Sequence, residues 1–315
     1  MTKVTRGQLR PAGQRTMRRS PLRRRAFAVV AALSVSLATS LVFALPANSL
    51  TSGGGIFHTI CGYSHSLPDD PIKFPNVPGR SHMHDFGGNS TTNADSTLAT
   101  LQVGTTNCVV NGSPAGAMAD RSGYWVPQLY FNGIPVSFVE QQAYYQSGGL
   151  PYVNTPPVGL KLVAGNHFAT APEPKSIVKW TCSGSAGAVV GSSTAPPVCP
   201  AGSLLKVVVL TQNCLAHALV VGGADGDDDT SQATYASGGQ CPVGYDPIAQ
   251  VRIEVKYPPG VDGRGLIQFS PDPNSGLFPY YSMHADWFNA WDATTLNNFV
   301  QGCIDAGVDC GNTMP

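Results

Sequence analysis

The sequence predicts a mainly β protein: an antiparallel, sandwich-like domain with long loops, four disulfides and a short C-terminal helix. Three observations lead to this prediction. The 315 residues include 35 Gly and 26 Pro but only 12% charged residues, a composition that disfavours long solvated helices and coiled coils. Short strand-like runs are separated by turn residues along the chain. Eight cysteines follow an apolar N-terminal segment, which is typical of an exported, disulfide-bonded protein.

Runs rich in β-branched and aromatic residues predict seven strands. They cover residues 55–62, 124–131, 134–139, 159–164, 177–182, 204–211 and 249–257. In the last run Val251, Ile253 and Val255 alternate with charged residues, so we expect one face of that strand to be buried. Helical spacing occurs only near the C-terminus, where Asp292 or Thr294 can cap a helix that runs through Ile304.

The N-terminus has the pattern of a signal peptide. Residues 1–25 are basic, residues 26–45 are apolar, and small residues surround Ala44 and Ala47. We therefore expect a signal peptide over residues 1–47, then a flexible lead over 48–56 and a single domain over 57–315. The signal peptide can direct export by the Sec or the twin-arginine route. The alternative is a membrane anchor, for which this Ala-, Ser- and Thr-rich segment is weakly hydrophobic. The expected protein is secreted or cell-wall associated, with no stable membrane span after processing.

Charge is distributed unevenly along the chain. Residues 1–25 hold nine of the nineteen basic residues and no acidic residue, which leaves ten basic against nineteen acidic residues in the remainder. An acidic domain repels phosphate backbones, so nucleic acid is not an expected partner.

The even number of cysteines predicts four disulfides and no free thiol. No Cys-x-x-Cys pair is present, so the usual zinc and thioredoxin-like signatures are absent from the sequence. Because a bond between neighbours in the chain closes a surface loop, we expect sequential pairing: Cys61 with Cys108, Cys182 with Cys199, Cys214 with Cys241, and Cys303 with Cys310.

The densest polar cluster in the sequence lies at residues 81–89. In an extended segment His82 and His84 point to the same face, so both imidazoles can meet one metal ion or one substrate. Asp85 points to the other face unless the chain turns at the following glycines. Three interpretations stay open: one divalent metal ion held by His82 and His84, metal-free catalytic or substrate-binding residues, or structural hydrogen bonding.

A second cluster, at residues 284–292, combines His284 and Asp286 with aromatic rings. Carboxylates can act as acid and base in glycoside cleavage, and rings such as Trp287 can stack on sugars. The structural alternative is that Trp287 and Trp291 anchor the last helix in the core while Asp292 caps it. For His284 and Asp286 we favour a functional site.

Other polar and aromatic residues are weaker candidates. Asn89, Tyr124, Trp125 and Tyr145 are candidate sugar-binding residues alongside Trp287, although core packing explains many of these aromatic positions equally well. Asp225, Asp227 and Asp229 have the alternate spacing of a calcium loop, but Thr230 replaces its glycine, which favours a solvated acidic loop.

Several of these motifs together resemble one secreted family. They are Pro78-Gly79-Arg80-Ser81-His82-Met83-His84-Asp85-Phe86-Gly87-Gly88-Asn89, Tyr124-Trp125-Val126-Pro127, and His284-Ala285-Asp286-Trp287-Phe288-Asn289-Ala290-Trp291-Asp292. The family is known as domain of unknown function nineteen ninety-six and occurs in actinobacteria and fungi, where it can accompany WSC carbohydrate-binding modules. The resemblance implies a glycan-related role. Where the family has two histidines in an Asp-His-x-x-His-x-x-Tyr stretch, this chain has Asp229 and Gln232, which implies an altered site if those histidines complete it.

The sequence thus predicts a secreted protein that acts on or binds polysaccharide of the cell envelope or the environment. As a glycan hydrolase it would use His82, His84, Asp85, His284 and Asp286 as catalytic residues. The alternative is a non-catalytic glycan-binding or structural envelope protein in which the same residues hydrogen-bond sugar hydroxyls.

Overall fold

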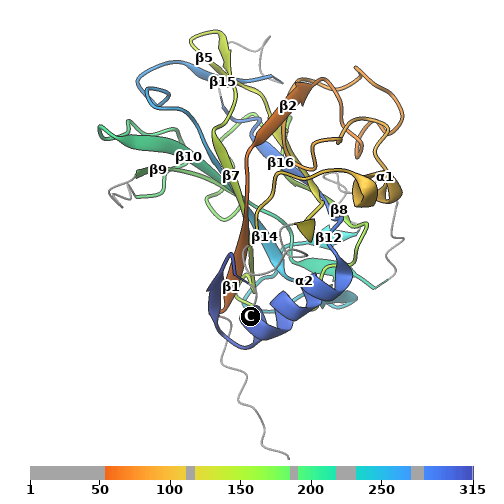
Figure 1. Ribbon diagram of the computed structural model, residues 1–315. Helices are drawn as coiled ribbons and strands as arrows, with labels where there is room; N and C mark the ends of the chain where they lie inside the picture. The colour runs from red at the N-terminus through yellow and green to blue at the C-terminus, as the bar shows by residue number, and fades with distance from the viewer. Residues whose placement is uncertain (1–53, 111–117, 185–190, 218–231, 271–279, 314) are drawn as a thin grey trace, which may run out of the picture. The chain divides into compact units, whose positions relative to one another are not determined.

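The protein is represented by a computed structural model that describes residues 54–110, 118–184, 191–217, 232–270, 280–313 and 315 (Figure 1). All of them belong to one compact unit, Asn48–Pro315. The predicted signal peptide, most of the predicted lead, and Asp225, Asp227 and Asp229 lie outside the described residues. Among the helices of the described part, none is long and apolar enough to cross a membrane.

The larger of the two main sheets has six strands. In sheet order they are β17 (Asp309–Gly311), β1 (Ile56–Cys61), β7 (Glu140–Gln146), β14 (Gln250–Lys256), β10 (Ser203–Leu210) and β9 (Val178–Gly184). Every neighbouring pair is antiparallel except β1 and β17, which are parallel. In Figure 1, β1 and β7 run side by side along most of their length. In β14 the side chains of Val251, Ile253 and Val255 are buried, which confirms the predicted buried face.

The second main sheet has five antiparallel strands. In sheet order they are β2 (Tyr63–Leu67), β3 (His84–Gly88), β4 (Gly123–Pro127), β16 (His284–Phe288) and β8 (Lys161–Gly165). Every residue of β3, β4 and β16 is buried, because both faces of this sheet are covered.

Two small antiparallel sheets contain the remaining strands of the described residues. One has the order β15 (Ile267–Phe269), β5 (Leu129–Phe131) and β6 (Ile134–Val136), and the other has the order β12 (Ala233–Thr234), β11 (Cys214–Ala216) and β13 (Tyr245–Pro247). The predicted strand over residues 124–131 is therefore two strands, β4 and β5, interrupted at Gln128.

The main core lies between the two large sheets. Phe57 and Ile253 of the six-stranded sheet belong to the same buried cluster as Val126 and Trp287 of the five-stranded sheet. This is the packing of a β-sandwich, so the predicted fold class is confirmed. A smaller cluster covers the outer face of the five-stranded sheet; its members are Ile72, Phe86, Leu101, Trp125, Val163, Phe288 and Ala290.

In the part of the chain that the structure describes, two α-helices border the sandwich. α2 (Ala293–Phe299) begins after Asp292, whose Oδ1 accepts a hydrogen bond from the Thr295 backbone N–H at 2.9 Å, and it continues as the π-helix η2 (Val300–Asp305). The predicted capped helix near the C-terminus is thus confirmed, and Figure 1 shows α2 near the first part of β1. The short helix α1 (Leu98–Val103) was not predicted; it buries Leu101 on the outer face of the five-stranded sheet.

The four disulfides join the cysteines that are adjacent in sequence. The bonds are Cys61–Cys108, Cys182–Cys199, Cys214–Cys241 and Cys303–Cys310. The predicted pairing is confirmed, and no free cysteine is left among the described residues, which include all eight.

Candidate active site

Two histidines lie in one row across the outer face of the five-stranded sheet. His84 of β3 pairs with Pro127 of β4, and His284 of β16 pairs with Gly165 of β8. In the antiparallel pairing of β16 with β4, Asp286 lies opposite Trp125. The same register, extended by two residues, places His284 opposite Pro127. His84 and His284 therefore flank the short proline side chain, and their rings can meet above it. His82 lies two residues before His84, so in an extended chain its side chain points to the same face of the sheet.

The three imidazoles converge on one point. The Nε2 atom of His284 lies 3.3 Å from that of His82 and 3.3 Å from that of His84. The three nitrogens all lie within 4.8 Å of one another. His84 and His284 are buried, and His82 is half-buried.

Backbone carbonyls determine which nitrogen carries the proton on two of these rings. The Asp69 carbonyl lies 2.9 Å from His84 Nδ1, and the Ser282 carbonyl lies 2.8 Å from His284 Nδ1. A carbonyl oxygen only accepts, so both Nδ1 atoms donate, and in the neutral ring each Nε2 presents a lone pair. Burial and, after it, the neighbouring imidazoles lower the pKa of all three histidines, that of His82 to about 2. The neutral form, which is the form that binds metal, is favoured.

A buried carboxylate completes the group. Asp286 Oδ2 lies 3.7 Å from His284 Nε2, and the side chain is almost fully buried. Neither carboxylate oxygen has a hydrogen-bond partner among the described residues. Burial, followed by repulsion from Asp70, raises the pKa of Asp286 well above its usual value. A buried carboxylate without a donor is costly unless it is protonated or lies beside a cation.

These groups border a cavity of about 300 Å³. It is lined by Asp70, Lys73, Phe74, Ser81, His82, Val163, His167, Phe168, His284 and Asp286. His84 does not line it, but its ring contacts that of His284, which does. A ligand in this cavity would therefore touch His82, His284 and Asp286 together.

Residues 70–291 match the family described as Domain of unknown function (DUF1996). The chain belongs to this family. Comparison with curated proteins gave no match, and comparison with solved structures gave none either. The DUF1996 match spans all three histidines of the group and Asp286, so the whole candidate site lies inside the family domain.

Asp85, a predicted catalytic residue of this DUF1996 domain, does not line the cavity. It follows His84 on β3 and therefore points to the opposite face of the sheet, where Ser66 and Gln128 donate hydrogen bonds to its Oδ1 at 2.6 and 3.1 Å. Burial raises its pKa to about 6. Asp85 is thus separated from the histidine group by the sheet itself.

The predicted sugar-binding residues lie in the interior. Tyr124, Trp125, Tyr145 and Trp287 have no exposed surface, and neither does Asn89, whose amide donates to the Leu101 and Arg121 carbonyls. Tyr124 and Tyr145 share a hydrogen bond, and Trp291 donates to the Tyr145 hydroxyl. We assign these five residues to the core, because none of them can touch a ligand in the cavity.

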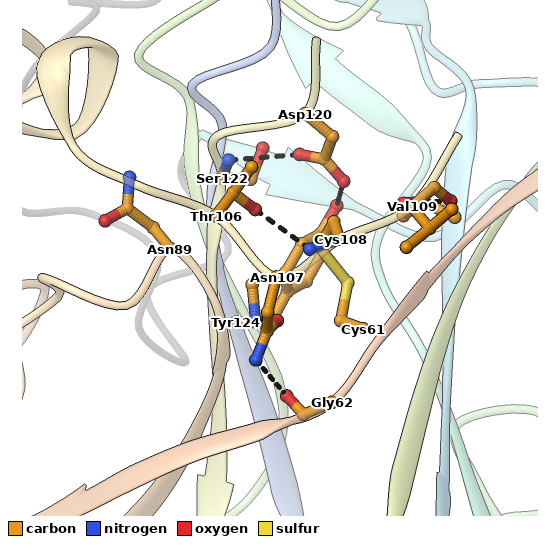
Figure 2. Close-up of a disulfide and its surroundings, with 12 residues drawn as sticks. Cys61, Gly62, Asn89, Thr106, Asn107, Cys108, Val109, Asp120, Ser122 and Tyr124 are labelled. Carbon is orange, nitrogen blue, oxygen red and sulfur yellow. Dashed lines mark hydrogen bonds between the residues drawn. A yellow bond between two sulfur atoms is a disulfide. The ribbon is translucent and has the colours of Figure 1, made fainter. Parts of the chain in front are cut away.

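A second group with ligand-type atoms surrounds the first disulfide (Figure 2). Cys61, Cys108 and Asp120 lie close together, but the two sulfurs are bonded to each other and cannot act as thiolate ligands. Asp120 accepts hydrogen bonds from the Ser122 backbone N–H and the Tyr124 hydroxyl, as Figure 2 shows. This group is a structural polar network and not a metal centre.

A larger cavity, of about 710 Å³, lies at the ends of β7, β9 and β10. Its described lining includes Lys175 and Lys179 but no histidine and no carboxylate. It therefore lacks the acid–base and metal-binding groups that distinguish the smaller cavity.

His167 and Phe168 were not predicted as site residues. Both line the smaller cavity, and the His167 ring centroid lies 5.7 Å from that of His284. They follow a predicted strand, and no sequence motif surrounds them. Only the pairing of β8 with β16 shows that they lie beside His284.

Proposed function

We propose that this protein is an exported, metal-dependent hydrolase that acts on polysaccharide of the cell envelope or the environment. The observation that carries the proposal is the convergence of three histidine Nε2 atoms beside a buried carboxylate that has no donor among the described residues. The carbonyls behind His84 and His284 fix both rings with their lone pairs toward the same point. Such carbonyl partners are the usual supports of metal-bound histidines.

A divalent cation would relieve two unfavourable features of the group at once: the facing lone pairs of the histidines and the buried negative charge of Asp286. The facing Nε2 lone pairs of His84 and His284, 3.3 Å apart, repel each other unless a proton or a metal ion lies between them, and burial disfavours the additional proton. Three neutral imidazoles with a free position are the ligands of a catalytic zinc site. His82, His84 and His284 would hold the ion, and the cavity would admit water and substrate to its open side.

Asp286 would then act as the general base and the general acid for the reacting water. A bound divalent ion lowers the pKa of a coordinated water, so that hydroxide forms near neutral pH. With such an ion bound, Asp286 would accept the proton that this water loses and pass it to the leaving oxygen, which would keep the electron pair of the broken bond. One water is thereby added across the bond.

Export and a glycan substrate are supported by separate features. Four disulfides fit an oxidising compartment, and the basic and apolar N-terminal segment fits an export signal. The resemblance of the domain to proteins that carry carbohydrate-binding modules supports a polysaccharide as the target.

The first test is the metal content of untagged protein collected from the medium of an exporting host. We expect one equivalent of a divalent transition metal, with zinc favoured. His84→Ala and His284→Ala should each weaken binding by more than about 100-fold, because each removes a ligand and not only an outer-shell partner. His217→Ala is the matched control, because that histidine is exposed and pairs with Asp246 away from the cavity. Less than about a tenth of an equivalent in the wild type would remove the metal from the proposal.

The second test is hydrolysis of purified cell-wall polysaccharides, followed by the release of soluble sugar. A chelator should abolish activity, and added zinc should restore it. Asp286→Asn should keep the metal but lower kcat by on the order of 100-fold or more, because the proton acceptor is lost. Retention of polysaccharide by the metal-loaded protein without any product would instead support the non-catalytic glycan-binding alternative.

A further inference from the structure

The turn that follows β8 carries an unusually exposed aromatic side chain. Phe168 is 74% exposed, more than any other aromatic residue of the described chain. The ring also lines the cavity that holds His82, His284 and Asp286.

This turn has a defined conformation. Asn166 Oδ1 accepts a hydrogen bond from the Phe168 backbone N–H at 2.8 Å, and the Asn166 carbonyl accepts one from Ala169 at 3.0 Å. The Phe168 ring lies against His167, with 3.8 Å between the ring centroids. The fold therefore holds the phenyl ring at the cavity.

The cavity also limits the size of what it can take. A second aromatic residue, Phe74, lines it together with the polar side chains of Asp70, Lys73 and Ser81. At about 300 Å³ it lies at the lower end of the range for small-molecule sites. A space of this size suits one sugar ring, whereas a groove that binds the interior of a polysaccharide is longer and open at both ends.

We propose that the cavity is a subsite for a single terminal sugar residue and that Phe168 is its stacking surface. Sugar rings have one apolar face of C–H groups that packs on an aromatic ring, while their hydroxyls need polar partners such as those that line this cavity. The inference rests on the proposed function and deepens it: the protein recognises chain ends and not chain interiors. Phe168 is a substrate-binding residue in this assignment and has no part in holding the metal.

The test measures binding of defined oligosaccharides to zinc-loaded protein by calorimetry. The probes are β-1,3-glucose, β-1,4-glucose and β-1,4-N-acetylglucosamine oligomers from one to six residues. We expect Phe168→Ala to weaken the best oligomer about 10-fold and Phe168→Tyr to restore most of that loss. We expect affinity to stop increasing beyond two residues, because the rest of the chain lies outside the cavity. Tyr152→Ala is the control, since Tyr152 is an exposed aromatic residue that does not line this cavity.

Three results would overturn the inference: no binding of any oligomer by the wild type, an unchanged affinity in Phe168→Ala, or an affinity that rises steadily to the hexamer. The metal content of every variant separates this inference from the proposed function. If the wild type holds no metal but Phe168→Ala still weakens oligosaccharide binding, the hydrolase proposal fails and the sugar subsite stands. If metal-dependent hydrolysis is found and Phe168→Ala binds the oligosaccharides as the wild type does, the hydrolase proposal stands and the sugar subsite fails.

Discussion

The position of His284 depends on a glycine in the neighbouring strand. Gly165 has φ +87°, and a Cβ built on it would lie 2.5 Å from the Met283 carbonyl oxygen and 2.9 Å from the Cα of His284. An L side chain there would meet both a strained backbone and the start of β16. The absence of a side chain at position 165 therefore sets how closely β8 and β16 approach and where His284 is held.

Gly165→Ala should shift the start of β16 and with it His284. We expect a loss of about 1–3 kcal/mol of unfolding free energy and at least about 10-fold weaker zinc binding. Chemical denaturation and a competition titration with a zinc chelator measure the two effects. Gly202→Ala is the matched control, because Gly202 has a similar φ of +81° but no atom within 4 Å of its built Cβ. Equal zinc affinity in both variants would mean that this glycine does not position the site.

Asp120 makes stability depend on pH in a predictable direction. Burial raises its pKa to about 6, although Ser122 and Tyr124 donate hydrogen bonds to it. The folded protein thus binds this proton more tightly than the unfolded chain does. The stabilising contribution is complete below about pH 4 and is lost as the pH rises through about 6.

Asp120→Asn should remove this dependence. The two proteins should unfold alike near pH 4, and the variant should become more stable than the wild type by on the order of 1–3 kcal/mol above pH 6.5. Urea unfolding at several pH values measures the gap, and Asp95→Asn, at an exposed position, serves as the control. A gap that is constant across this pH range would show that Asp120 does not titrate in the folded protein.

At the scale of the elements, burial explains which strands the sequence predicted. β14 has one buried side and one charged side, so its alternation was visible. β3 and β16 are buried at every position, because the core covers one face and a second apolar cluster covers the other. A strand with two covered faces has no alternation of polar and apolar residues. The equally buried β4 was still predicted from its Tyr124-Trp125-Val126 run, whereas β3 and β16 also contain Gly, Asp and Ala, which are depleted in strands, and were missed.

The candidate site was predictable in composition but not in geometry. His82, His84, His284 and Asp286 stood out as polar groups in an apolar chain, and the structure brings them together. The parity of Asp85 already indicated that it points away from His84. The sheet order that sets β3 and β16 on either side of β4 could not be read from the sequence, because strand pairing depends on contacts between distant segments. Without that order, no pattern identified His167 or Phe168.

The disulfides should differ in what they contribute. Cys61–Cys108 closes a loop of 47 residues and Cys303–Cys310 one of 7. Because a bond that closes a longer loop removes more conformations from the unfolded chain, we expect the paired Cys→Ala variants to lose about 4 and about 2 kcal/mol, respectively. Urea unfolding measures both. Thiol titration of unfolded, unreduced wild type should find no free thiol, and a larger loss for the 303/310 pair would contradict the loop-length argument.

At the scale of the whole molecule, metal binding should raise thermal stability. An ion that binds the folded protein at 100 times its Kd adds about 2.7 kcal/mol, which raises the Tm of a chain of this size by several degrees. Calorimetry with and without zinc measures the shift. His84→Ala should abolish it, and His217→Ala should keep it. A shift that survives His84→Ala would place the stabilising ion elsewhere on the protein.

The histidine group brings together residues that the ribosome synthesises at well-separated times. His84 and His284 are separated by 200 positions, and each is held by a strand that pairs with β4. Closing so long a loop is entropically slow, and the chain must complete β16 before the third imidazole exists in place. A metal ion present during synthesis would find only His82 and His84, two residues apart on one segment. Metal uptake should accordingly be one of the last events of maturation, and the ion would be taken from the compartment in which folding is completed.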